Sequence, residues 1–167
     1  MAKVDGKTFM RRRTLLLSVV TLTVGLASLA DEALASDVED VKAADQAFHA
    51  ALSAMDGQTM AGLWAHKASV TNIGPGSKAV EVGFEDAVSK WMATTVPGRY
   101  SELKAQMTSF AAVEVNGNVA WVVGMESVSG KTKTGEAISF DAMVTDIFEK
   151  DGGKWLMVSH HAQRPPK

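Results

Sequence analysis

The sequence predicts an α+β domain whose helices come first and whose long antiparallel strands come last. Apolar side chains recur mainly at helical spacing up to Gly98, and from Tyr100 onward they alternate with a period of two, which is typical of strands. Asn116-Gly117 separates two of the alternating segments, and this dipeptide favours a two-residue hairpin loop. Neighbouring strands are therefore expected to pair antiparallel and to pack against a layer of helices.

Three helices are expected before the long strands. A capping box at Ser36 and Glu39 begins the first, which runs to about Met55. The segment GQTMAGLWA forms a short second helix, and a third follows Gly83 until Pro97 ends it. The alternating segments predict one short strand and four long ones, at about 68–73, 101–115, 119–129, 136–149 and 154–162.

The first 35 residues form a pattern of their own. Arg11–Arg13 precede a run of seventeen uncharged residues, and small side chains at Ala33 and Ala35 suit a cleavage point. We interpret residues 1–35 as a signal peptide cleaved after Ala35 and residues 36–167 as one domain. The protein is accordingly expected to be periplasmic or secreted in a bacterium, and to meet the membrane only through this segment during export.

The N-terminal sequence is compatible with more than one export route. The arginines followed by Thr14, Leu15 and Leu16 resemble the twin-arginine motif, but they suit the general secretory route equally well. An uncleaved anchor is a third interpretation, because seventeen residues is the lower edge of a membrane span.

Composition excludes several classes of function. The 132 residues after the signal segment hold 12 Lys and Arg against 16 Asp and Glu, so there is no basic stripe for nucleic acid. The chain has no cysteine, which excludes thiolate catalysis and thiolate metal ligands. A domain of this size buries a sufficient core without disulfides.

Four stretches of the chain carry a resemblance to a known family. They are AMDGQTMAGLWA, NIGPG, VGFEDAVSKW and TDIFEKDGGKWLMVSHHAQ, spread over nearly all of the expected domain. Their order resembles the SnoaL-like, ketosteroid isomerase-like group of the nuclear transport factor two-like superfamily. The resemblance implies a cone-shaped, curved antiparallel sheet wrapped around about three helices, a deep apolar pocket inside, and a homodimer formed through the outer sheet face.

Two adjacent histidines close the last predicted strand. Neighbouring strand residues point to opposite faces, so His160 and His161 enter one pocket only if a bulge intervenes. Alternation places His161 with Trp155 and Met157, and the resemblance implies that His161 faces the cavity. His160 is then expected at the rim or in the dimer face, and His49 is expected to be exposed. No metal site is expected, because zinc needs three or four converging ligands.

Asp141, Asp146 and Tyr100 complete the candidate catalytic residues around His161. A carboxylate that accepts from one imidazole nitrogen fixes the tautomer and raises basicity. Asp141 lies in a mixed row suited to a cavity wall, whereas Asp146 lies in an apolar row, which predicts a paired carboxylate or a raised pKa. The phenol of Tyr100, the only tyrosine, is able to donate to a developing oxyanion. The structural alternatives are rim carboxylates and a packing tyrosine.

The expected ligand pocket is lined by aromatic, amide and methionine side chains, which suit a small apolar or aromatic molecule. They are Trp64, Asn72, Trp91, Trp121, Met143 and Met157. No cofactor is expected, because the chain has no glycine loop that would cradle a phosphate. Met143 stands where many SnoaL-like members carry arginine, and the catalytic sets of the related epoxide hydrolases and isomerases cannot be carried over residue by residue.

Three functions are left open by these observations. The first is an exported pocket protein that binds a small apolar or aromatic ligand. The second is a cofactor-independent isomerase, dehydratase or cyclase, in which His161 and Asp141 move a proton while Tyr100 or Asn72 steadies an oxyanion. The third is a dimeric interaction module. Fold alone does not choose among them.

Overall fold

The computed structural model describes the backbone of residues 15–166 and the side chains of residues 32–166. It contains two units, residues 1–36 and residues 37–167, and the second unit is the α+β domain. Arg11–Arg13, on which the export motif depends, lie outside the described residues. Among helices of the described residues, none is long and apolar enough to cross a membrane.

The helices follow the predicted order, but the first does not begin at the expected capping box of Ser36 and Glu39, because α1 is continuous through both residues. Their bounds are α1 Leu15–Ala54, α2 Gly57–Leu63, the π-helix η1 Glu85–Thr95 and α3 Val96–Arg99. Asp56 caps α2, because its carboxylate accepts hydrogen bonds from the backbone N–H groups of Gln58 and Thr59. The expected helix end at Pro97 was wrong. Proline lies in the first turn of α3, where its missing N–H is not needed.

Six strands form one sheet in the order β2-β1-β6-β5-β4-β3. Their bounds are β1 Thr71–Ile73, β2 Glu81–Val82, β3 Tyr100–Asn116, β4 Val119–Thr132, β5 Ala137–Asp151 and β6 Lys154–Gln163. The four long strands are confirmed as an antiparallel meander. The purely antiparallel sheet was wrong, because β1 pairs parallel with β6. No hairpin joins these two strands, so turn geometry does not impose an antiparallel pairing.

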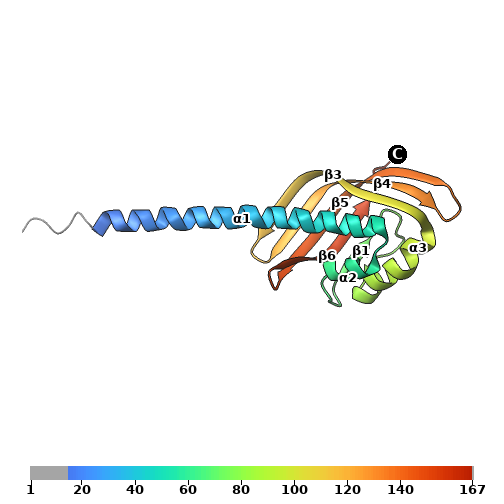
Figure 1. The fold of residues 1–167 in the computed structure, drawn as a ribbon, viewed down its shortest axis with the longest axis horizontal. Coiled ribbons are helices and arrows are strands. Elements are labelled where there is room, and N and C mark those ends of the chain that lie inside the picture. Colours follow the sequence, from blue (N-terminus) through green and yellow to red (C-terminus); the bar gives the residue numbers. More distant parts are fainter. Residues whose placement is uncertain (1–14, 167) are drawn as a thin grey trace, which may run out of the picture. The chain divides into compact units, whose positions relative to one another are not determined.

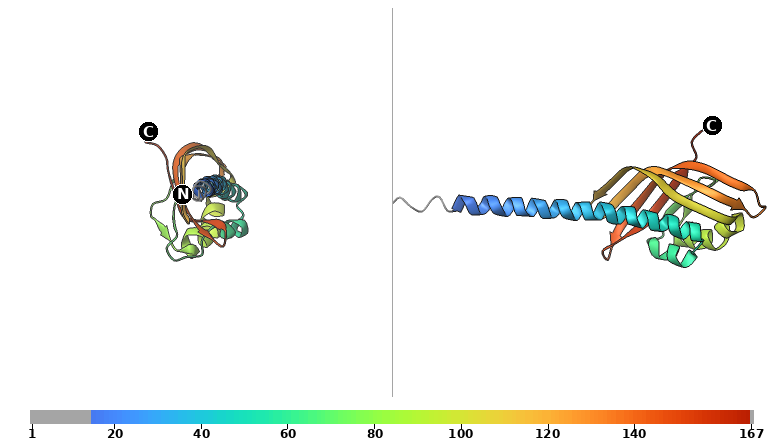
Figure 2. Two further views of the ribbon diagram at one scale, coloured as in Figure 1. Left: turned by 90° about the vertical axis from the view of Figure 1, so that its left-hand side faces the viewer. Right: turned by 45° about the horizontal axis from the view of Figure 1, so that its top comes forward.

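The sheet curls around the helices, as Figures 1 and 2 show for the domain. Register shifts in β3, after Met107 and after Phe110, mark the bend opposite Gly124 of β4. A Cβ atom on Gly124 would lie 2.1 Å from the carbonyl oxygen of Ser109, far inside van der Waals contact. Glycine therefore permits the close approach of the two strands at the bend.

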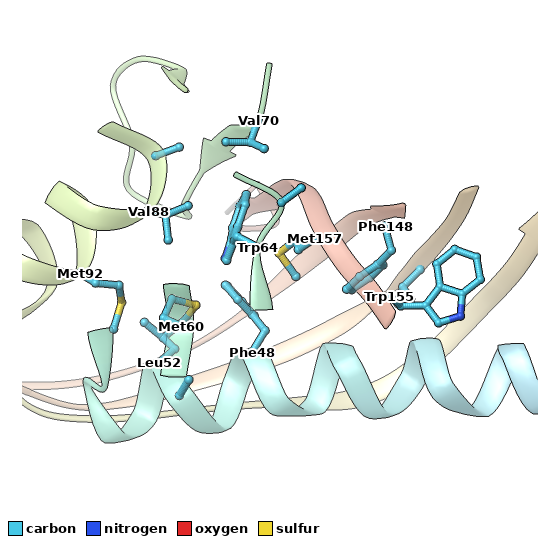
Figure 3. Packing of buried hydrophobic residues seen from close by; sticks show 14 of the residues in the cluster. Phe48, Leu52, Met60, Trp64, Val70, Val88, Met92, Phe148, Trp155 and Met157 are labelled. Atoms are coloured by element: carbon cyan, nitrogen blue, oxygen red, sulfur yellow. The ribbon is translucent and has the colours of Figure 1, made fainter. Parts of the chain in front are cut away.

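The core lies between the concave face of the sheet and the helices. Figure 3 shows Phe48 of α1 facing Trp64 and Met157, with Phe148 and Trp155 further along the same side. Phe48 and Met157 are completely buried and Trp64 is 1% exposed. Two expected pocket residues, Trp64 and Met157, are thus parts of the packed core.

Candidate functional site

A β-bulge in β6 decides which of the adjacent histidines faces the interior. Ile147 of β5 pairs with Ser159, but the next residue, Phe148, pairs with Met157, so Val158 has no partner on β5. The extra residue reverses the alternation beyond Met157. His160 is consequently 2% exposed, whereas His161 is exposed on the outer face. The expected placement of both histidines was wrong, because strict alternation was assumed through the bulge.

His160 forms a buried pair with Asp146. Its Nδ1 lies 2.7 Å from Asp146 Oδ1, and the two residues are register partners on β6 and β5. Burial raises the pKa of Asp146, and although His160 counteracts this, the pKa remains raised, at about 6. Burial would lower the pKa of His160, but the negative charge of Asp146 and the hydrogen bond to it raise the pKa overall. The sequence predicted either pairing or a raised pKa for a carboxylate in this apolar row, and Asp146 has both.

A second buried pair joins α1 to the sheet. His49 Nε2 lies 3.1 Å from Glu126 Oε2, while His49 Nδ1 lies 2.9 Å from the carbonyl oxygen of Asp45 and 3.1 Å from its Oδ1. All three side chains are buried. Burial would lower the pKa of His49, but its hydrogen bonds to Asp45 and Glu126 raise it to about 10. At neutral pH this imidazole is a buried cation between two carboxylates.

The exposed position expected for His49 was wrong, and Asp45 and Glu126 were missed altogether. A usable signal was present in the helical spacing, because Val41, Asp45, Phe48 and His49 lie on one stripe of α1. Glu126 also interrupts the inward row of β4, between Gly124 and Val128. Polar residues inside an apolar row are informative, since burying them costs free energy unless they are paired.

A cavity of about 250 Å³ reaches both pairs. Glu126 and His160 lie among its lining residues, and apolar walls come from α1, η1 and the sheet. The wall residues are Leu52, Trp91, Val96, Tyr100, Leu103, Val128 and Phe140. Toward the surface, the loop Gly74–Lys78 and the side chains of Glu81, Thr95, Arg99 and Arg164 complete the lining. The cavity therefore joins an apolar chamber to two ionisable groups.

The remaining predicted site residues divide into three groups. The first, Trp91 and Tyr100, lines the cavity. The second is Asn72 alone, which is completely buried. Its Nδ2 donates to the carbonyl oxygen of Ala87, while its Oδ1 has no hydrogen-bond partner among the described residues.

The third group lies on the outer face of the sheet and does not reach the cavity. Trp121 of β4 is 37% exposed, Met143 of β5 is 44% exposed, and Asp141, two residues before Met143, is exposed as well. Asp141 and His161 are therefore not brought together in an enclosed site, and the expected cavity placement of Trp121, Met143 and Asp141 was wrong. No bulge interrupts this part of β4 and β5, so adjacent residues point to opposite faces. The residues that point inward are Val122, next to Trp121, and Ala142 and Val144, on either side of Met143.

Within residues 32–166, no group of three or more His, Cys, Asp or Glu side chains is arranged to hold a metal ion. The buried histidines instead make hydrogen bonds to carboxylates. What the site offers chemically is two imidazole–carboxylate pairs at one apolar cavity, an arrangement suited to holding and moving protons.

The curved sheet over helices, with a cavity opening between them, defines an α+β protein of the nuclear transport factor two-like (NTF2-like) type. A family model for the SnoaL-like domain matches residues 41–165. The chain belongs to the SnoaL-like domain family. Among curated proteins, none matches the chain significantly.

Solved structures share this fold at low sequence identity. An NTF2-like superfamily protein from Salmonella enterica is 16% identical with a TM-score of 0.73, over 80% of this chain and 94% of that one. A candidate dehydratase of the NTF2-like family from Streptomyces avermitilis is 22% identical with a TM-score of 0.69, over 79% and 99%. A hexachlorocyclohexane dehydrochlorinase from Novosphingobium barchaimii is 17% identical with a TM-score of 0.61, over 85% and 91%.

Proposed function

We propose that this protein is a cofactor-independent enzyme that binds a small molecule with an apolar or aromatic body and catalyses proton transfer on it, as in an elimination or an isomerisation. The observation that carries the proposal is that both Glu126 and His160 line one cavity whose inner walls are apolar. Apolar side chains around such groups lower the local dielectric and strengthen their electrostatic interactions with a reacting molecule.

Glu126 is the proposed general base. Its Oε2 is engaged by His49, and its Oε1 makes no hydrogen bond within residues 32–166, so this oxygen is free to accept a proton. The cation on His49 pairs with the other oxygen, Oε2, and compensates the buried carboxylate. The proton would pass from a carbon of the substrate to Glu126 Oε1.

His160 is the proposed general acid. The hydrogen bond between its Nδ1 and Asp146 leaves Nε2 as the nitrogen available to a ligand. Because the pKa of His160 is raised, the imidazolium form is populated at neutral pH and is able to donate a proton to a leaving group or an oxyanion. A carboxylate and an imidazolium at one cavity thus fit the roles of base and acid.

The names of two structural relatives, a candidate dehydratase and a dehydrochlorinase, support an elimination among the possible reactions. Both names describe removal of a small group together with a proton. At the identities given above, this support concerns the reaction class alone and leaves the substrate open.

The proposal is tested with 5-nitrobenzisoxazole, a small aromatic compound whose ring opens to a coloured phenolate when a base removes its carbon-bound proton. The wild-type protein should accelerate this reaction with saturation. His160→Gln should lower the rate about tenfold, because the product phenolate needs only modest assistance from an acid. The matched variant His161→Gln, altered at the exposed neighbour, should retain the wild-type rate. Rates that do not saturate, or equal losses in the two variants, would overturn the proposal.

We also propose a homodimer formed through the outer sheet face. Trp121, Val123 and Met143 are large apolar side chains exposed on the adjacent strands β4 and β5, and contiguous apolar surface of this kind favours association. Trp121→Glu should convert a dimer into a monomer, as measured by sedimentation, with Glu136→Gln, in the exposed turn between β4 and β5, as a control. A wild-type protein that sediments as a monomer at micromolar concentration would rule the dimer out.

A further inference from the structure

We propose that the ligand of the cavity carries a carboxylate, which Arg99 and Arg164 bind at the cavity mouth while the apolar body lies against the inner walls. This inference rests on the proposed function for the identity of the cavity, and it adds a charged group to a ligand that the sequence predicted only as apolar or aromatic.

The first observation is where the arginines lie. The expected domain, residues 36–167, has only two arginines, and both line this cavity. Arg99 comes from the end of α3 and Arg164 follows β6, so the fold brings together residues that are far apart in the sequence. Lys78, on the loop between β1 and β2, adds a third cation to the same lining.

The second observation is that these cations are not neutralised by the protein. Among residues 32–166, Arg99, Arg164 and Lys78 have no carboxylate oxygen within ion-pair distance. Five lysines elsewhere do have acidic partners; they are Lys42, Lys67, Lys90, Lys131 and Lys150.

Two carboxyl groups, those of Glu81 and Glu126, also line the cavity, and the pairing of Glu126 with His49 leaves Glu81 as the acidic group near the mouth. Burial, together with the charge of Asp86, raises the pKa of Glu81. The three cations of the mouth therefore exceed its negative charge.

The third observation concerns how the guanidinium groups are held. Arg164 lies over the ring of Phe140, with its Cζ atom 3.6 Å from the ring centroid. The Arg99 guanidinium packs against the loop at Gly76, where an added Cβ would lie 3.0 Å from Nη1. The stacking of Arg164 uses the face of its guanidinium and leaves the N–H donors at the edge free, which suits recognition of a planar carboxylate.

The experiment measures binding by titration calorimetry with two probes of the same shape, 2-naphthoate and its uncharged amide, 2-naphthamide. The wild-type protein should bind 2-naphthoate at least about tenfold more tightly, because a charge-assisted hydrogen bond is stronger than a neutral one. Added salt should weaken binding of the acid and leave binding of the amide unchanged.

The double variant Arg99→Gln, Arg164→Gln should lose most of the preference for the acid, since only Lys78 of the three cations remains, and its affinity for the amide should be unchanged. Arg164→Lys should retain part of the preference, because it keeps the charge but loses the planar fork. Lys154→Gln, which removes an exposed cation from the hairpin between β5 and β6, is the matched control and should behave as wild type. Circular dichroism confirms that the variants are folded.

Equal affinity of the wild type for both probes would overturn the proposal, as would the absence of saturable binding of either probe. The same holds if Lys154→Gln reduces the preference as much as the arginine changes do, since the effect would then reflect net charge alone. Calorimetry needs no turnover. A carboxylate preference without proton transfer on 5-nitrobenzisoxazole would therefore contradict the proposed function and support this inference. Proton transfer without a carboxylate preference would support the proposed function and contradict this inference.

Discussion

Replacing Glu126 with glutamine is expected to lower the rate of ring opening of 5-nitrobenzisoxazole by about 100-fold to 10,000-fold, the range typical of losing a general base. Glutamine keeps the shape of the side chain and an oxygen that accepts a hydrogen bond from His49, but it cannot take up the substrate proton. The saturating rate constant is the quantity to measure, because the loss should appear there and binding of the probe should change little.

Glu114→Gln provides the matched control, since Glu114 is an exposed glutamate on β3 and does not line the cavity. Binding of 2-naphthamide to Glu126→Gln, measured by calorimetry, shows whether the cavity is intact in the variant. If Glu126→Gln binds the amide normally and turns over the probe at the wild-type rate, Glu126 is not the base.

His49→Gln is expected to cost about 3 to 5 kcal/mol of stability near neutral pH, because it removes a buried cation and leaves the carboxylates of Asp45 and Glu126 without compensation. The cost should depend on pH. The pKa of His49 is about 10 in the folded protein against 6.5 in an unfolded chain. Its stabilisation is therefore complete below pH 6.5 and is lost as the pH rises through 10.

Urea unfolding of the wild type at a series of pH values should show a free energy of unfolding that decreases by about 5 kcal/mol between pH 6.5 and 10. His49→Gln should show a smaller slope, since only His160, whose pKa is also raised, then contributes, and His161→Gln, altered at an exposed histidine, should keep the wild-type slope. Asp146 changes the stability over a lower pH range. Its pKa is raised from 3.8 to about 6, so its effect is to decrease stability as the pH rises between those values. Parallel slopes for wild type and His49→Gln between pH 6.5 and 10 would show that His49 is not a buried cation.

Polar residues that stand in otherwise apolar rows of the sequence indicate buried pairs that strand alternation alone does not predict. Asp146 could be predicted as a paired carboxylate, because it stands in an otherwise apolar row of β5 and a lone buried charge is costly. The same reasoning applies to Asp45, His49 and Glu126, which stand in the inward rows of α1 and β4. Their partners could not be predicted, since they meet across elements that are distant in the chain.

By itself, the sequence determined the three helices, the four long strands with their hairpin turns, and the resemblance to SnoaL-like proteins, because hydrophobic period and turn chemistry depend on residues that are close in the chain. The tertiary structure decided the parallel pairing of β1 with β6, the burial of His160 rather than His161, and the placement of Arg99 and Arg164 in the lining of one cavity. These depend on contacts between distant segments. The bulge at Val158 arises where β6 pairs with β5, and a single unpaired residue there exchanges the two faces of the strand for every residue that follows.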